Sequence, residues 1–192
     1  NLRKGNEVIV DIMVVRHEKG KVHKNYIDGN EVLSDKKVKR AMKKTNEKND
    51  IWKIFSQKKF VTSDYEDDKN RIIEKYNEIG YRDAVILEDS VVNFSDKRVD
   101  IYLKVEEGNK YYLKDITFVG NTKYPTEYLS ALLDMKPGDV YNQKKLDERL
   151  QSDDDAVSNV YYNNGYLFFG ADPVEVNVEN DSISLEIRIQ EG

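Results

Sequence analysis

The chain of 192 residues has no cysteine, and it has only three prolines and one tryptophan. The lack of cysteine excludes disulfides and thiolate metal sites, although it leaves the cellular compartment open. No stretch approaches the roughly 20 consecutive apolar residues that a membrane-spanning helix requires. The phosphate-binding loop, the dinucleotide-binding glycine pattern, the serine nucleophile elbow and a cysteine nucleophile are all missing. We therefore predict no enzymatic activity, no cofactor and no small-molecule substrate.

The charged residues do not indicate a metal site or a nucleic-acid site. A net charge of −5 argues against binding to nucleic acid. The acidic runs at residues 64–68 and 153–155 do not match a calcium-binding loop. His17 and His23 lie near each other in the sequence without a third metal ligand. We expect neither metal nor nucleic acid to bind.

A repeat is the most informative feature that the sequence does contain. Residues 75–108 and 160–192 both predict the end of a helix, a Gly-Tyr pair, a strand, a turn and an alternating strand that ends in Glu-Gly. The pair Gly80-Tyr81 recurs as Gly165-Tyr166, 85 positions later. We expect both glycines to close a helix with a positive φ angle, which glycine adopts at little cost. A repeat of this size indicates an array of small modules.

Each unit is predicted to have the order β-α-α-β-β, with two helices covering a three-stranded sheet. In the first unit we expect a strand over residues 23–28, a helix from Ser34 or Asp35 to about Lys44, and a helix opened by a capping box of Ser63 and Glu66. Strands over residues 82–91 and 98–105 follow.

The second unit repeats this order. We expect strands over residues 111–119, 167–178 and 183–189, a helix that begins at Pro125, and a longer helix capped by Asn142. The acidic run 153–155 interrupts the apolar stripe of that helix, so a bend there is expected. A strand over residues 7–15 is expected to be the end of a preceding unit.

In these features the chain resembles tandem POTRA domains, the polypeptide-transport-associated modules of outer-membrane β-barrel assembly factors. The matching residues are the first strand that ends in Gly-Asn at Gly29 and Gly120, the helix that ends in Gly-Tyr, and the last strand that ends in Glu-Gly. The resemblance implies a tail of a preceding module in residues 1–20 and complete modules in residues 21–108 and 109–192. We expect the chain to be a fragment of a longer protein.

The resemblance also implies a role. Such modules form a periplasmic scaffold below a C-terminal membrane barrel of the same protein, bind unfolded outer-membrane proteins, and dock accessory lipoproteins of the assembly complex. Two alternatives stay open. The modules could belong to a secretion or translocation transporter that recognises one secreted protein, or they could be a passive structural spacer.

The strand after the first Gly-Tyr pair is the candidate client-binding site, since in the family it lies at a sheet edge. An extended client can add to such an edge as a further strand. The predicted edge contains Asp83, Val85, Leu87 and Asp89 and no proline, whereas the matching strand of the second unit contains Pro173. The alternative is an inert edge protected by the charges of Arg82, Asp83, Glu88 and Asp89.

A second candidate is a partner patch that contains Trp52, Phe55, Lys43 and Lys44. Residues 36–59 carry ten basic side chains against two acidic ones. The aromatic side chains either pack under the helices or serve as an exposed hook for an accessory protein. The lysines either form a solvated helix face or contact an acidic partner or anionic lipid.

Overall fold

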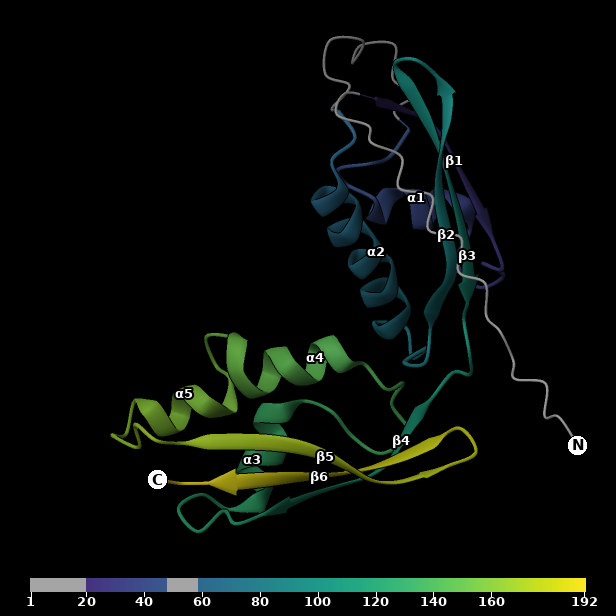
Figure 1. Cartoon of the computed structure of the whole chain (residues 1–192). Helices are drawn as coiled ribbons and strands as arrows, with labels where there is room; N and C mark the ends of the chain where they lie inside the picture. The colour runs from purple at the N-terminus through teal and green to yellow at the C-terminus, as the bar shows by residue number, and fades with distance from the viewer. Residues whose placement is uncertain (1–19, 48–58) are drawn as a thin grey trace, which may run out of the picture.

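The computed structural model describes residues 20–47 and 59–192 and shows two α+β units arranged as an L (Figure 1). Each unit has one three-stranded mixed sheet, with the strand orders β1-β3-β2 and β4-β6-β5. The strand predicted over residues 7–15, the proposed tail module of residues 1–20 apart from Gly20, and the side chains of Trp52 and Phe55 lie outside the described residues. None of the helices within the described ranges has the length and apolar character needed to cross a membrane.

The first unit has the predicted order of elements. They are β1 (Lys21–Asp28), α1 (Asp35–Ala41), α2 (Thr62–Asn77), β2 (Val85–Ser95) and β3 (Arg98–Glu106). The central strand β3 runs parallel to β1 and antiparallel to β2. On β3 the alternate residues Val99, Ile101, Leu103 and Val105 are buried, as the period-two pattern predicts, and the last three share a core with the helices. Both β1 and β2 are therefore edge strands of this sheet.

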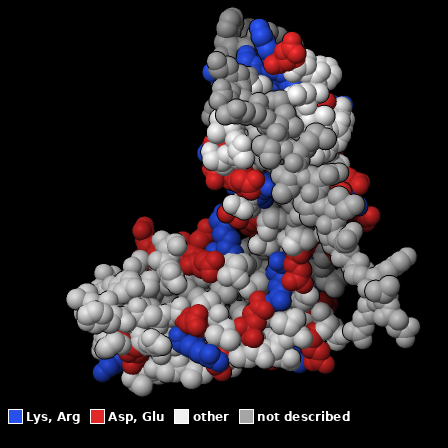
Figure 2. Space-filling model, viewed as in Figure 1, with Lys and Arg blue, Asp and Glu red and all other residues white. Residues whose placement is uncertain are grey.

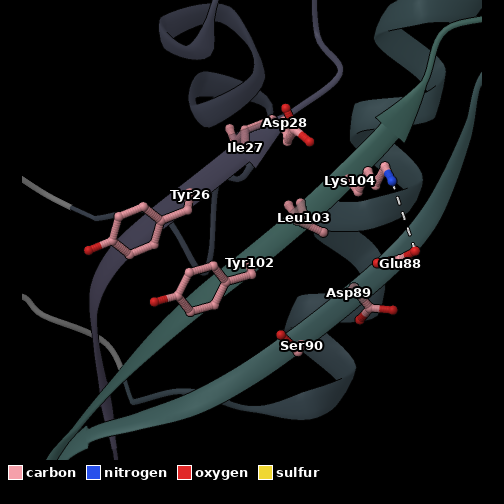
Figure 3. A pocket seen from close by; sticks show the side chains of 9 residues that line it. All are labelled: Tyr26, Ile27, Asp28, Glu88, Asp89, Ser90, Tyr102, Leu103 and Lys104. Carbon is pink, nitrogen blue, oxygen red and sulfur yellow. Dashed lines mark ion pairs between the residues drawn. The ribbon is translucent and has the colours of Figure 1, made fainter.

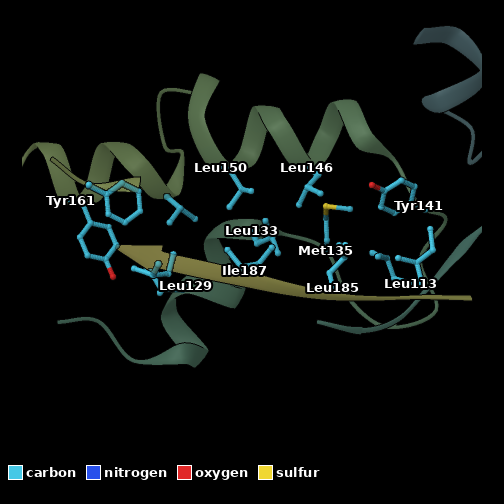
Figure 4. Close-up of a cluster of buried hydrophobic side chains, with 14 of the residues drawn as sticks. Leu113, Leu129, Leu133, Met135, Tyr141, Leu146, Leu150, Tyr161, Leu185 and Ile187 are labelled. Carbon is cyan, nitrogen blue, oxygen red and sulfur yellow. The ribbon is translucent and has the colours of Figure 1, made fainter. Parts of the chain in front are cut away.

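The second unit repeats this topology with more helical segments. They are β4 (Tyr112–Val119), α3 (Thr126–Leu133), α4 (Gln143–Asp147), the π-helix η2 (Glu148–Ser152), α5 (Val157–Tyr162), β5 (Gly170–Glu179) and β6 (Ser182–Gln190). Its core lies between the helices and β6 (Figure 4), where Ile183, Leu185, Ile187 and Ile189 all point inward. This arrangement confirms two tandem modules, each with a three-stranded sheet and a helical layer.

Several predicted boundaries differ from the structure. The capping box at Ser63 is wrong: α2 already begins at Thr62, its N-cap is Val61, and no side chain caps it. The backbone N–H of Phe60 bonds to the carbonyl of Gly20, which fixes the chain just before the helix. The first helix stops at Ala41 rather than at about Lys44, because residues 43–45 form a turn.

The edge strands also begin later than predicted. β2 starts at Val85 instead of residue 82, and β5 starts at Gly170 instead of residue 167. In both units the residues after the Gly-Tyr pair form a turn, with the N–H of Ala84 bonded to the carbonyl of Tyr81 and that of Phe169 to Tyr166. This turn uses the backbone groups that a strand would need for pairing.

The second-unit helix is interrupted at the acidic run, as predicted. The backbone of Asp153 is extended (φ −72°, ψ 153°), and α5 restarts four residues later. Arg149 lies beside the break and pairs with Asp153 at 3.2 Å and with Asp155 at 2.5 Å. The predicted N-cap is confirmed as well, since the Asn142 side chain accepts a hydrogen bond from the N–H of Lys145 at 2.9 Å.

The glycines predicted to be structural occupy positions that only glycine tolerates well. Gly80 (φ +97°) and Gly165 (φ +89°) follow the last helix of their units, and Tyr81 and Tyr166 fold back onto it. The N–H groups of these tyrosines bond to carbonyls five residues earlier, at 3.0 and 3.1 Å. At Gly29 and Gly120 a Cβ atom would collide with a carbonyl oxygen of the neighbouring central strand.

Candidate functional site

The edge strand β2 is the candidate binding site. Among the described residues β2 pairs with β3 alone, so its other side presents backbone N–H and C=O groups that have no strand partner. A β-bulge between Ile86 and Glu88 takes Leu87 out of the pairing register, and the side chains of Val85 and Leu87 are exposed. β2 contains no proline, so each of its residues keeps a backbone donor.

The charged side chains near β2 are engaged by neighbours within the fold. Asp89 points toward α2, where its carboxylate lies 3.2 Å from Lys69 Nζ. Burial alone would lower the pKa of Lys69, but hydrogen bonds to Glu66 and Asp89 hold it above its ordinary value. Glu88 lies 4.0 Å from Lys104 on the neighbouring strand. These contacts reduce the protection that the charges give to the edge.

Asp83 does not belong to the strand. It lies in the turn before β2, where its Cβ packs against Gly108 and its carboxylate accepts a hydrogen bond from Arg82 at 3.1 Å. Of the four predicted edge residues, Val85 and Leu87 are thus the apolar side chains that β2 itself exposes. Asp83 makes its contacts in the turn before β2, and Asp89 makes its contact on the inner face of β2, toward α2.

The outer face of the first sheet carries an aromatic surface that the sequence analysis did not identify. Tyr26 on β1 and Tyr102 on β3 are directly paired, and their rings stack with centroids 4.7 Å apart. The rings of His23 and Phe94 stack at 3.8 Å, and the His23 Nδ1 lies 2.8 Å from an oxygen of Asp100. A hollow of about 420 Å³ lies on this face and is lined by all three strands (Figure 3). The parallel register of β1 and β3 creates this surface, and no local sequence pattern reveals it.

The matching strand of the second unit, β5, is a less suitable acceptor. Pro173 lies within it, opposite Ile187 of β6, and removes one backbone donor. Glu175 on the same strand reaches across to the first unit, where it pairs with Arg82. Like β2, β5 has a bulge, which lies between Glu175 and Asn177 and contains the exposed Val176.

The two units contact each other at the end of α2. The N–H of Tyr111 donates to the carbonyl of Gly80 at 2.9 Å, and the guanidinium of Arg82 lies 4.9 Å from the centre of the Tyr111 ring. A Cβ atom on Gly80 would be 2.6 Å from Cγ1 of Val140, so this glycine allows the second unit to approach closely. At Gly165, the matching position, nothing lies within 4 Å among the described residues.

Ion pairs surround this junction, and Figure 2 shows basic and acidic side chains gathered where the units meet. Glu78 at the end of α2 lies 3.1 Å from Lys144 of the second unit and 2.5 Å from Lys75. Burial alone would raise the pKa of Glu78, but hydrogen bonds from Lys75 and Lys144 hold it below its ordinary value.

The two lysines of the predicted partner patch have different surroundings. Lys44 Nζ lies 2.9 Å from carboxylates of both Asp64 and Asp67, so its charge is balanced by the start of α2. Hydrogen bonds that Lys44 donates to Asp67 and Asp64 raise the pKa of Lys44. Lys43 is exposed and points elsewhere, into a groove beside α1 and α2. The aromatic half of the patch, Trp52 and Phe55, lies outside the described residues.

The acidic run in α2 includes one carboxylate that is fully buried. Asp68 accepts hydrogen bonds from the N–H of Thr45 at 2.6 Å, from its hydroxyl at 2.7 Å and from the N–H of Lys44. Arg71 also donates to it. Asp68 thus holds the turn after α1 against α2.

In residues 20–47 and 59–192 no three His, Cys, Asp or Glu side chains come together as metal ligands would.

The family model of the surface antigen variable number repeat, POTRA, matches residues 20–108 and 111–192. The chain belongs to the POTRA family. It is 26% identical over 190 residues to the outer membrane protein assembly factor BamA of Neisseria meningitidis, covering 97% of this chain and 23% of that protein. It is 26% identical over 166 residues to a putative outer membrane protein assembly factor of Treponema pallidum, covering 83% of this chain and 18% of that protein. The chain thus spans less than a quarter of either relative.

Solved POTRA structures share this fold. The crystal structure of Haemophilus influenzae BamA POTRA3-5 has a TM-score of 0.66 at 20% identity, covering 90% of this chain and 66% of that one. The structure of Haemophilus ducreyi BamA that lacks POTRA domains 1-3 has a TM-score of 0.61 at 17% identity, covering 90% of this chain and 29% of that one. At this identity the likeness concerns the fold, and it agrees with two tandem POTRA domains.

Proposed function

We propose that these POTRA modules are the periplasmic, non-enzymatic part of an outer-membrane assembly factor and bind unfolded outer-membrane proteins by strand addition to β2. The edge of β2, which has no strand partner among the described residues, carries this proposal. Strand addition takes its affinity from backbone hydrogen bonds, which suits clients of many sequences. The assembly role is supported by the Neisseria and Treponema relatives, which are named as assembly factors.

In this proposal the modules are tethered to the outer membrane through a C-terminal barrel and also dock accessory lipoproteins of the assembly complex. The client would lie antiparallel or parallel to β2, with alternate side chains on the outer face of the sheet. There it would meet the exposed side chains of Val92 and Phe94. The ring of Phe94 stacks on His23, and the stacked pair of Tyr26 and Tyr102 lies on the same face. The outer face would thus add apolar contact to the backbone bonds.

Disulfide cross-linking tests the proposal cleanly because the chain has no cysteine of its own. Leu87→Cys places a thiol at the bulge of β2, and Val176→Cys places one at the bulge of β5, where exposure is similar (50% and 51%). The probe is a peptide from the last strand of an outer-membrane barrel that carries one cysteine. We expect Leu87→Cys to cross-link faster by about tenfold, the ratio that a preference of 1.4 kcal/mol gives.

The control is the same peptide with alternate backbone nitrogens methylated, so that its side chains are kept and its donors on one edge are lost. This peptide should cross-link slowly to both variants. Equal rates for the two positions, or full activity of the methylated peptide, would exclude strand addition to β2. No binding at either position would favour a passive spacer.

A further inference from the structure

A groove of about 380 Å³ lies between α1 and α2, and Lys144 near the start of α4 also lines it. Its lining contains six basic side chains and two carboxylates, although the chain as a whole has a net charge of −5. The basic residues are Lys37, Arg40, Lys43, Arg71, Lys75 and Lys144. The groove is therefore a local reversal of the overall charge, and no residue of β2 lines it.

Half of these basic groups have no acidic partner within the described part of the chain. Arg71 is held by the buried Asp68, and Lys75 and Lys144 share Glu78. Lys37, Arg40 and Lys43 have no carboxylate of residues 20–47 or 59–192 within 4.0 Å, the distance of an ion pair. The ion pairs of this region are made by the neighbouring basic residues instead. Their uncompensated charge favours an anionic ligand.

The floor of the groove is apolar. Leu33 and Ala41 are buried beneath it, and Ile79 at the end of α2 packs against the same core. An apolar floor with a basic rim suits a peptide segment in which acidic residues flank an apolar side chain. A bilayer surface fits less well, because headgroups meet protruding basic side chains more readily than a recess between two helices.

We propose that this groove binds an acidic segment of a partner protein, with carboxylates at Lys37, Arg40 and Lys43 and one apolar side chain on the floor. Lys144 belongs to the second unit, whereas the other lining residues belong to the first. A ligand that fills the groove therefore contacts both units. The site is separate from β2, so this inference stands or fails independently of strand addition.

The test uses the whole 192-residue chain and a fluorescent peptide of alternating glutamate and leucine, with a second peptide in which glutamine replaces glutamate. Arg40→Glu combined with Lys43→Glu reverses the charge at two exposed groove positions. Lys97→Glu combined with Lys136→Glu makes the same charge change at exposed positions outside the groove. All four positions lie on the surface, so both variants should fold, and circular dichroism checks this.

We expect the groove variant to bind the acidic peptide about tenfold more weakly than the parent chain, and the control variant to stay within about twofold. Affinity should also fall as salt is added, since these charges are exposed. The glutamine peptide should bind weakly to every form. Equal affinity of the two charge variants, or no binding of the acidic peptide, would overturn the proposal.

Two further measurements address the ligand and the bridging. Vesicles of phosphatidylglycerol and phosphatidylcholine are the second probe, and binding of vesicles without binding of peptide would overturn the assignment to a protein segment. Lys144→Gln should weaken peptide binding to a smaller extent than the double variant, about threefold. An unchanged affinity of Lys144→Gln would overturn the claim that the ligand contacts both units.

Discussion

The two units have the same topology, but they differ at matching positions along the last helix, the turn after it and the edge strand. In the first unit α2 is continuous, with Asp68 buried inside it, and Gly80 packs against the second unit. In the second unit the helix breaks at Asp153, which is 85 positions after Asp68, and no described residue lies within 4 Å of a Cβ placed on Gly165. The repeat therefore determines the fold, while the positions that depart from it determine what each unit contacts.

The edge strands show the same contrast. β2 keeps all its donors, and β5 contains Pro173 and sends Glu175 to the neighbouring unit. After the closing glycine, Arg82 and Asp83 of the first unit correspond to the highly exposed Leu167 and Phe168 of the second. A position used for contact between the units in one repeat thus carries exposed apolar side chains in the other.

The largest difference is expected at the matching aspartates. Asp68→Ala removes a fully buried carboxylate and leaves the buried N–H of Thr45 without a partner, so it should cost about 4 kcal/mol of unfolding free energy. Asp153→Ala removes a partly exposed carboxylate beside Arg149 and should cost less than about 1 kcal/mol. Urea unfolding of both variants checks this. Equal losses would show that the buried network contributes no more than a surface ion pair.

The closing glycines should give the next largest difference. Both Gly80→Ala and Gly165→Ala place a side chain at positive φ, but a Cβ at Gly80 also meets Val140 and the Tyr111 carbonyl. We expect a loss of about 3 kcal/mol for Gly80→Ala and about 1 kcal/mol for Gly165→Ala. The excess should appear as a weakened contact between the units, measured by NMR relaxation of each unit. Independent tumbling in the Gly165 variant alone would contradict this account.

The smallest difference concerns the Glu-Gly ends of the last strands. Burial alone would raise the pKa of Glu191, but hydrogen bonds from the Thr122 hydroxyl and from the N–H groups of Lys123 and Thr122 lower it to about 2. A lowered folded-state pKa adds stability above the ordinary value of 4.5, and this stability is lost as the pH falls from 4.5 toward 2.

Glu191→Gln should therefore reduce the change in Tm between pH 4.5 and pH 2 by about 2–4 °C. Glu107→Gln is the matched variant in the first unit, where the carboxylate accepts from the N–H of Val32 at 2.9 and 3.1 Å. Thermal unfolding between pH 2 and pH 5 compares the two. A larger flattening of the pH dependence of Tm by Glu107→Gln than by Glu191→Gln would contradict the role given to Glu191.

Local patterns predicted the order of elements because the features that define them are short in range. Alternation predicted the buried face of β6, the Asn142 cap was found, and Gly80 and Gly165 were expected at positive φ. The Ser63 cap failed because α2 already begins at Thr62, after a segment that the bond between Phe60 and Gly20 holds in place. Such contacts between distant residues are not encoded in a local pattern.

The candidate site shows the same limit. The absence of proline pointed to β2, yet only the structure shows that Asp89 turns toward Lys69. The lysine-rich segment was noticeable in the sequence, but Lys44 is balanced by α2, while Lys43 joins a groove with Lys144 from the other unit. A groove built from both units becomes visible only once their relative placement is known.

The most direct test of strand addition is a backbone NMR titration of the chain with the peptide from the last strand of an outer-membrane barrel. We predict that amide shifts concentrate on β2 and the adjoining outer face of the first sheet, with little change on β5. Shifts confined to the second unit, or no shifts at millimolar peptide, would contradict the central claim that β2 accepts a client strand.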